Sequence, residues 1–417
     1  MNLANYIIII LISIINATKL LIPMDLNQTD HLKAYGIVFW NLENDREVDW
    51  LLNYRGGSFM MDSNESLKSE CLIRGVKFEQ INANQYSQIL STIADNNMDI
   101  ALLETVPKIA VYSPKGKQPW DDAVTLALTY AEVSYDTIFD DEVLSGELKK
   151  YDWLHLHHED FTGQYGKFYK NYRNRAWYKK MEYDFNQTAT KWDMGTVHNL
   201  KKRIAKYIKE YVKQGGFLFA MCSATDSYDI ALASLNVDIA HSVFDGTPID
   251  SDYLKKLNFD NTFAFKDFEL YTDPMIYEYS TIDIPPSHQP VARGAEEDYF
   301  SLFEFSAKWD PVPTMLTQNH VGVVNGFMGQ TTAFNRNQIK EHVTILGEVE
   351  GTNIVKYIHS NIGKGSFTFL GGHDPEDYRH MVGDPPTDLS LHPNSPGYRL
   401  ILNNILFPSA RKKDRKT

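Results

Sequence analysis

Cysteine is scarce in this chain of 417 residues, which contains only Cys71 and Cys222. Two cysteines exclude a disulfide-dense scaffold and any zinc module built from several cysteines. They fall in different predicted domains, so we expect no disulfide between them. Each is therefore expected as a free thiol, whose reactivity depends on its surroundings.

Positive charge is also scarce. Lys and Arg number 41 against 54 Asp and Glu, which gives a formal net charge of -13. Binding to nucleic-acid phosphates needs clustered Lys and Arg, so a nucleic-acid partner is excluded. The one basic run, residues 411–417, predicts a solvated tail.

Long apolar runs are missing except at the N-terminus, where Tyr6 to Ile15 form one. This run is shorter than the roughly 20 residues of a membrane-spanning helix but fits a signal-peptide core. No Lys or Arg precedes this run. For cleavage after Ala17, Ile15 is also larger than the small residue that is usual at the third position before the cut. The alternative is a buried strand or an uncleaved anchor. We predict a signal peptide at residues 1–17, export to the periplasm or the outside, and no membrane span once it is removed.

The composition, with 43% hydrophobic and 23% charged residues, is that of a globular protein, and the length predicts two or three domains. Residues 18–107 predict a small N-terminal α/β domain. Its strands are expected at KLLIPMD, EVDWLLNY and KFEQI, and its helices at HLKAYGIVFWNL and QYSQILSTIA. The pair Gly56 and Gly57 favours a tight turn over a phosphate-binding loop, because it lacks the spacing of either phosphate fingerprint.

A second series of strands and helices begins after Pro107. Strands are expected at KIAVYSP, YDTIFD, YDWLHLHHED and FLFAM. The segment HNLKKRIAKYIKEYVKQGG places Leu200, Ile204 and Ile208 on one helical face and ends at Gly215. This succession predicts an α/β fold with a doubly wound, mostly parallel sheet.

Residues 245–340 are rich in proline and aromatic residues and lack periodicity, which predicts an irregular cap insertion. After it, IVKYIHS, NIGKG and SFTFLGG predict an antiparallel hairpin, and PGYRLILNNILF a closing helix. The sheet domain thus comprises residues 108–244 and 341–410. We expect the hairpin to return to the sheet that carries Cys222.

The segment AMCSA lies between a predicted strand and a predicted helix. A nucleophile elbow strains its central residue, so the residues two before and two after it must be small, as Ala220 and Ala224 are. The turn would present Cys222 above the sheet and place the Ser223 amide where an oxyanion forms. We predict Cys222 as a nucleophile; the alternative is a small buried hydrophobe.

The segment FTFLGGHDPEDY ends a strand at two glycines and presents His373. A thiol nucleophile needs a base, and the base needs an orienting carboxylate. We predict His373 as the base, with Glu376 favoured over Asp374 as the carboxylate. The alternative is that His373 caps the turn and the acids are solvated.

The element order, the cysteine at the elbow and the segment GKGSFTFLGGHDPE resemble the class I glutamine amidotransferase-like superfamily, over residues 108–240 and 345–408. The resemblance implies the fold of that superfamily. Its members include amidotransferases, peptidases and non-catalytic relatives. Amidotransferases have the elbow Gly-x-Cys-x-Gly and a glutamate two residues after the histidine. This chain has alanines in place of both elbow glycines, and Glu376 comes three residues after His373. Both features depart from the pattern of enzymes that hydrolyse glutamine.

Over nearly its full length the chain also resembles exported bacterial proteins labelled asparagine synthetase B-like. It does not meet the requirements of that label. Residue 2 is Asn2 rather than the N-terminal cysteine of such glutaminases, and no SGGxD pyrophosphate loop occurs.

The segment HLHHED places His155 and His157 on one face of a strand, with His158 and Glu159 at its carboxyl end, where open α/β sheets bind ligands. In the resembled superfamily this loop completes the oxyanion hole. We predict His157, His158 and Glu159 as ligand-binding residues. The alternative is a metal site centred on His155, His157 and His373, because imidazoles suit zinc.

Three functions follow in order of preference. The first is an exported cysteine-dependent hydrolase acting on an amide or similar acyl substrate, in which Cys222 attacks a carbonyl and His373 serves as base and then acid. The second is a non-catalytic protein that binds a small molecule or a glycan above the strand ends. The third is a metal-dependent hydrolase. We predict no cofactor, and the sequence leaves the oligomeric state open.

Overall fold

The computed structural model describes residues 19–116, 118–285, 295–310 and 312–411. The signal peptide predicted for residues 1–17 lies outside the described residues, as does nearly all of the predicted tail. Within the described part, every helix is too short or too polar to cross a membrane.

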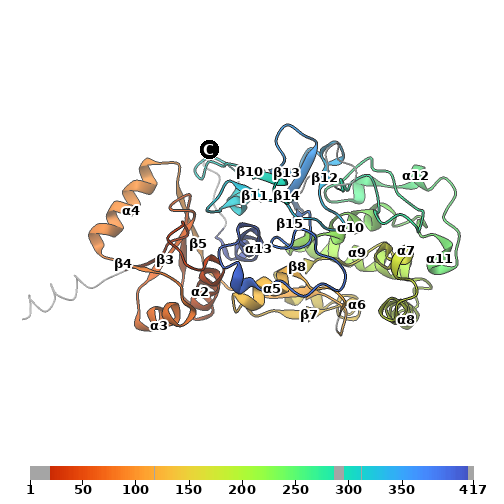
Figure 1. Ribbon diagram of the computed structural model, residues 1–417, viewed down its shortest axis with the longest axis horizontal. Coiled ribbons are helices and arrows are strands. Elements are labelled where there is room, and N and C mark those ends of the chain that lie inside the picture. Colours follow the sequence, from red (N-terminus) through yellow and green to blue (C-terminus); the bar gives the residue numbers. More distant parts are fainter. Residues whose placement is uncertain (1–18, 117, 286–294, 311, 412–417) are drawn as a thin grey trace, which may run out of the picture.

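The N-terminal domain is an α/β unit whose five-stranded sheet is antiparallel and has the order β4-β1-β3-β2-β5 (Figure 1). Helices α2 and α3 pack on one face of this sheet, and α4 packs on the other. The elements are β1 (Lys19–Ile22), α2 (His31–Glu43), β2 (Val48–Leu52), β3 (Ser58–Asp62), α3 (Glu65–Arg74), β4 (Glu79–Ile81), α4 (Ala83–Asp95) and β5 (Asp99–Leu103).

The tight turn predicted at the glycine pair is confirmed. Gly56 and Gly57 have φ of 76° and 84°, which favours glycine. A Cβ at Gly56 would lie 2.4 Å from the Met24 carbonyl oxygen, so the backbones approach too closely for a side chain.

The second sheet has ten strands and is mixed. Its order is β11-β10-β13-β14-β15-β9-β8-β6-β7, and β12 pairs with β14. The run from β15 to β7 is parallel, as predicted, but the other pairs are antiparallel, so the sheet as a whole is not mostly parallel. The strands are β6 (Ile109–Tyr112), β7 (Asp136–Ile138), β8 (Trp153–Leu156), β9 (Phe217–Met221), β10 (Tyr299–Leu302), β11 (Val323–Asn325), β12 (Phe334–Asn335), β13 (Thr344–Glu348), β14 (Ile354–Ile362) and β15 (Gly365–Leu370).

Helices cover both faces of this sheet because its buried strands are apolar on both sides. In β9, Phe217 and Phe219 point to the layer of α5 and α13, whereas Leu218 and Ala220 point to the layer of α9 and α10. The helices of this domain are α5 (Ala123–Tyr130), α6 (Asp140–Leu144), α7 (Tyr169–Tyr172), α8 (Ala176–Lys191), α9 (Val197–Gln214), α10 (Ser223–Ala233), α11 (Ser242–Asp245), α12 (Tyr253–Lys256) and α13 (Pro396–Leu406).

The hairpin of β14 and β15 returns to the sheet that carries the cysteine, as predicted. Strand β15 lies parallel to β9, and Leu370 pairs with Met221. The residues that follow these two strands therefore reach the same edge of the sheet, which places Gly371 beside Cys222.

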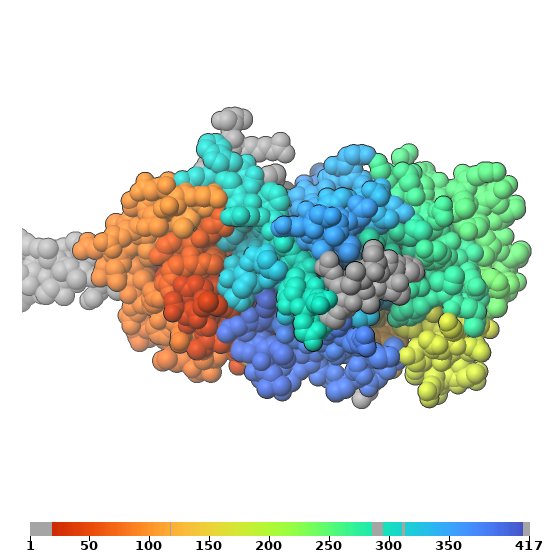
Figure 2. Space-filling model, turned by 45° about the horizontal axis from the view of Figure 1, so that its top comes forward, coloured from red at the N-terminus to blue at the C-terminus, as the bar shows by residue number. Residues whose placement is uncertain are grey.

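The segment 245–340 is only partly the separate cap that the sequence predicts. Strands β10, β11 and β12 lie inside it and join the ten-stranded sheet. They have two to four residues each, too few for a period-two pattern to show in the sequence. This segment also contacts the N-terminal domain, where the Asn53 amide donates to Gln318 Oε1 at 2.7 Å. Figure 2 shows its cyan surface directly against the orange surface of that domain.

Candidate active site

Cys222 occupies a strained turn between β9 and α10. Its φ of 51° and ψ of -139° lie in a region that residues with a side chain rarely adopt. Ala220 and Ala224, two residues away on either side, are fully buried. The turn is held because Thr225 donates to the Cys222 carbonyl from its amide at 3.2 Å and its hydroxyl at 2.7 Å. Such strain, fixed by its surroundings, is typical of active sites.

A loop covers the thiol. The amide of Gln330 donates to Cys222 Sγ at 3.3 Å, and the Cys222 side chain is 3% exposed. The buried ammonium of Lys356 holds the loop by donating to the carbonyls of Phe327 and Thr332 at 2.7 Å each. Burial lowers the pKa of Lys356 to about 8. The Gln330 amide and the buried Lys356 thus hold this loop over the thiol.

The elbow is tied to the end of β8. The Ala224 amide donates to the His157 carbonyl at 2.8 Å. The amides of Ala224 and Thr225 are therefore engaged, whereas no bond of the Ser223 amide is found in the described part of the chain. This arrangement leaves the Ser223 amide as a donor beside the thiol, at the N-terminus of α10.

His373 follows β15 and packs among other histidines. Its ring centroid lies 4.4 Å from that of His157, which follows β8, and 4.4 Å from that of His380. Its Nε2 lies 3.5 Å from an oxygen of Asp121, in the segment between β6 and α5. The carboxylate beside His373 therefore comes from a segment about 250 residues earlier in the chain.

The two acids predicted to orient His373 face elsewhere, which corrects that prediction. Asp374 accepts hydrogen bonds from the amide of Glu376 at 2.9 Å and the hydroxyl of Thr387 at 2.6 Å. Glu376 pairs with His392 at 3.1 Å. Asp374 closes the turn that follows the histidine, a common role of aspartate, and this turn directs Glu376 away from the ring.

The sequence analysis missed Asp121. A signal was present, because Asp121 and Asp122 stand together before a helix and after the first strand of the sheet domain. At the carboxyl ends of parallel strands, such a pair belongs with the other functional candidates.

Cys222 and His373 reach the same edge of the sheet but share no hydrogen bond. Among the hydrogen bonds of the described residues, Sγ has the one from Gln330 and none with an imidazole. Catalytic hydrogen bonds are often long in the absence of substrate and tighten when it binds.

Acidic and imidazole groups alternate along this edge. Asp122 lies 3.1 Å from His155 Nε2 and 3.4 Å from His157 Nδ1. Asp121 also lies 2.7 Å from His380 Nε2. Burial opposes ionisation of both carboxyl groups, but the adjacent histidines hold the pKa of Asp121 and of Asp122 below the ordinary value. Both therefore ionise readily despite burial.

The predicted ligand-binding residues lie at this edge. His158 is 5.0 Å from His157 and 5.9 Å from His373 between ring centroids. Burial and the neighbouring His157 lower the pKa of His158 well below its ordinary value. Glu159 Oε1 lies 4.0 Å from His158 Nε2, and burial raises the pKa of Glu159 to about 8.

A buried loop, residues 159–168, continues from β8 in a strained conformation. Tyr165 and Lys167 have φ of 52° and 56°. The carboxylate of Asp160 organises it by accepting from the amides of Thr162 and Gln164 at 2.7 Å each. A loop that is both buried and strained is unusual, and loops at the ends of parallel strands commonly bind ligands.

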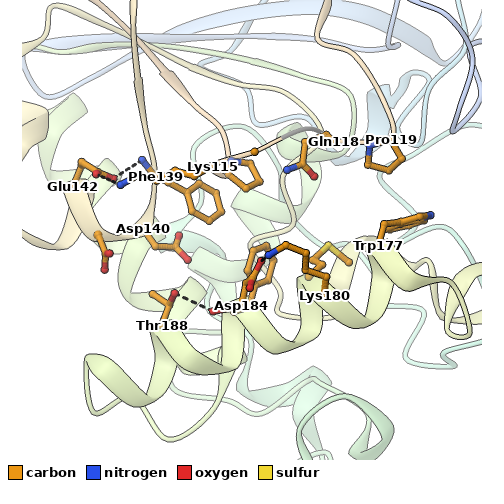
Figure 3. Close-up of a pocket in the computed structure, with 15 residues that line it drawn as sticks. Lys115, Gln118, Pro119, Phe139, Asp140, Glu142, Trp177, Lys180, Asp184 and Thr188 are labelled. Atoms are coloured by element: carbon orange, nitrogen blue, oxygen red, sulfur yellow. Dashed lines mark hydrogen bonds and ion pairs between the residues drawn. The ribbon is translucent and has the colours of Figure 1, made fainter.

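A separate cavity of about 250 Å³ lies between residues 114–116 and 118–119, α6 and α8 (Figure 3). Lys115 and Lys180 line it, but they pair with Glu142 and Asp184. The histidine cluster and Cys222 do not line this cavity. Trp120 separates the two regions, because its ring contacts Trp177 of the cavity and His158 of the cluster.

Comparisons with known proteins give no family. No protein-family model and no curated protein matches the chain. A cytoplasmic protein from Salmonella typhimurium aligns at 12% identity over 73% of this chain and 100% of its own, with a TM-score of 0.34. A beta-galactosidase from Bacillus circulans aligns at 12% identity over 66% of this chain and 29% of its own, with a TM-score of 0.27. Likenesses this distant carry no argument about function.

Proposed function

We propose that the chain is an exported hydrolase that cleaves an amide or similar acyl bond, with Cys222 as the nucleophile. The strained backbone of Cys222, at the start of a helix and at the carboxyl end of a central strand, is the observation on which this rests. The element order of the sheet domain and the resemblance of its motifs to the class I glutamine amidotransferase-like superfamily support it. Fold likeness alone does not give a function, so the proposal depends on the elbow and its neighbours.

In the proposed reaction, His373 removes the proton of the Cys222 thiol, and the thiolate attacks the carbonyl carbon of the substrate. The Ser223 amide donates to the oxyanion of the tetrahedral intermediate. Protonated His373 then gives its proton to the leaving amine, and a thioester remains on Cys222. Water, deprotonated by His373, hydrolyses this thioester and restores the thiol. Asp121 orients the imidazole and stabilises its charged form.

The covering loop has to move for this reaction. The Gln330 amide donates to Sγ in the closed state. Displacement of this amide by the substrate would free Sγ for the carbonyl carbon and bring the imidazole within reach. Induced closure or opening of such loops is common in enzymes.

Mass spectrometry after incubation with activated acyl esters and peptide amides tests the proposal. We expect an acyl adduct on the peptide that contains Cys222, formed by the wild-type protein and absent from Cys222→Ser. Cys71→Ser is the matched control and should acylate as the wild type does. Hydrolysis that persists in Cys222→Ser, or the lack of any adduct in the folded wild type, would contradict it.

One observation favours the second candidate, a protein that binds a small molecule or a glycan without chemistry. The thiol is 3% exposed and already hydrogen-bonded, which also suits a structural cysteine. Under that account the elbow cysteine is inert, and the acylation experiment distinguishes the two accounts directly.

A further inference from the structure

Three histidines from the ends of β8 and β15, the two strands that flank β9, lie with their rings close together. His157 and His158 follow β8, and His373 follows β15. One ring nitrogen of each lies within 4.8 Å of a ring nitrogen of both others. More than 200 positions separate His373 from the adjacent pair His157 and His158, so the fold itself creates the cluster.

Two ring nitrogens in this cluster lack a polar partner among the described residues. Among the described residues, Nε2 of His157 and Nδ1 of His158 are buried without a hydrogen bond or an ion pair, whereas Nδ1 of His157 and Nε2 of His373 face carboxylates. His157 is 1% exposed. A buried polar atom without a partner destabilises a protein, so two such nitrogens in one histidine cluster indicate a missing ligand.

We infer that His157, His158 and His373 bind a divalent transition-metal cation of the zinc type. Imidazole nitrogens suit zinc, and three of them leave a fourth position open for water or substrate. Carboxylates stand behind two of the rings, since Asp122 lies 3.4 Å from His157 and Asp121 lies 3.5 Å from His373. Metal-binding histidines commonly have such a carboxylate behind them, which fixes the ring.

Given the proposed function, a cation bound to this cluster also affects the chemistry of Cys222. A cation on the three histidines occupies one ring nitrogen of His373, the residue proposed as the base for Cys222. The metal-bound protein therefore lacks a free base, and the cation suppresses acylation of the thiol. Metal binding itself does not depend on Cys222.

Titration of the metal-free protein with Zn²⁺, in competition with a coloured chelator, tests the inference. We expect one tight site in the wild type and binding weakened by at least about tenfold in His158→Ala. His342→Ala is the matched control, because His342 is exposed and outside the cluster, and it should bind as the wild type does. Mg²⁺, which prefers oxygen ligands, should not compete.

Two results would overturn the inference: no Zn²⁺ site in the wild type, or equal affinity in His158→Ala and the wild type. If His158→Ala fails to fold, the Co²⁺-loaded wild type gives a second readout, and visible bands of four-coordinate Co²⁺ are expected. Their absence also overturns the inference. Acylation of the metal-free protein is measured separately, so failure of the metal site and failure of the thiol chemistry are distinguishable.

Discussion

At the scale of single residues, the two cysteines illustrate how position determines chemistry. Cys71 lies inside α3 and is fully buried, and burial raises the pKa of its thiol to about 12. Cys222 lies at the N-terminus of a helix with an amide donor on its sulfur. The first environment disfavours a thiolate, whereas the second combines a strained backbone with a hydrogen-bond donor on the sulfur.

The backbone strain at Cys222 can be measured directly. We expect Cys222→Gly to be more stable than Cys222→Ala by roughly 1 kcal/mol, because glycine adopts a positive φ without the cost that alanine has. Both variants lose the sulfur, so the comparison isolates the backbone. Urea unfolding of the two proteins gives the difference. An alanine variant more stable than the glycine variant would show that the turn is unstrained.

The assignment of Asp121 is a second prediction at this scale. With a substrate identified by acylation, Asp121→Asn should lower kcat by about 100-fold or more with little change in KM, because His373 loses its orienting carboxylate. Glu376→Gln is the control and should leave kcat within about twofold. The reverse ranking of these two variants would restore the acid that the sequence favours.

At the scale of elements, parallel strands bring the candidate residues to one edge. The ends of β6, β8, β9 and β15 supply Asp121, His157, Cys222 and His373. This convergence follows from the parallel order, because each strand begins at the same side of the sheet.

The short connection after β15 fixes the position of His373. Gly372 allows this connection to pack closely against Phe327. Gly372 has φ of 99°, and a Cβ there would lie 2.2 Å from the Phe327 ring. Gly383 has a nearly equal φ of 98° but open space around it. We expect Gly372→Ala to lower the unfolding free energy by roughly 2 kcal/mol more than Gly383→Ala, since only the first adds a clash to the strain. Urea unfolding measures it, and equal losses would contradict the close packing.

Much of the element order was predictable from the sequence, and the reasons are local. Helix α9 has a long apolar face and a glycine at its end, and the hairpin has a turn signal between two alternating strands. Helix α3 was missed because it buries only Leu67 and Cys71 and so shows little apolar periodicity. Strand β3 was also missed.

The candidate site was predictable only where a local motif exists. The elbow identified Cys222, and the glycines before His373 identified the histidine. Asp121 had no motif, and its role depends on the order of strands, which the sequence does not show directly. The wrong choice of Glu376 came from expecting the turn after His373 to bring its side chain back to the ring, whereas Asp374 closes that turn and Glu376 faces away.

At the scale of the whole molecule, a buried histidine of the N-terminal domain packs on a half-buried histidine of the segment 245–340. His31 of α2 stacks on His320 with 4.4 Å between ring centroids. Arg399 of α13 lies beside them and donates to the Met24 carbonyl at 3.0 Å. The contact therefore combines two neutral imidazoles with a buried cation.

This contact predicts acid sensitivity. Burial and Arg399 lower the pKa of His31 to about 4 and of His320 to about 3, against 6.5 in the unfolded chain. Below pH 6.5 the unfolded chain therefore binds more protons than the folded chain, and stability is lost as the pH falls toward 4. We expect a loss on the order of 2–4 kcal/mol from these two groups.

Urea unfolding at a series of pH values checks this prediction. The double variant His31→Gln and His320→Gln removes both groups and should flatten the profile between pH 6.5 and 4. A profile of the double variant as steep as that of the wild type would assign the acid sensitivity to other groups.

The most direct test of the central claim, a reactive thiol at Cys222, is the rate of alkylation of each cysteine by iodoacetamide in the folded, metal-free protein. Both side chains are buried, with exposures of 3% and 0%, so Cys71 is an internal control for access. Mass spectrometry of the two peptides over time gives both rates. The account predicts that Cys222 reacts at least about tenfold faster than Cys71, because Cys222 lies at the strained elbow beside a helix N-terminus, whereas burial raises the pKa of the Cys71 thiol. Equal, slow rates at the two positions would contradict it.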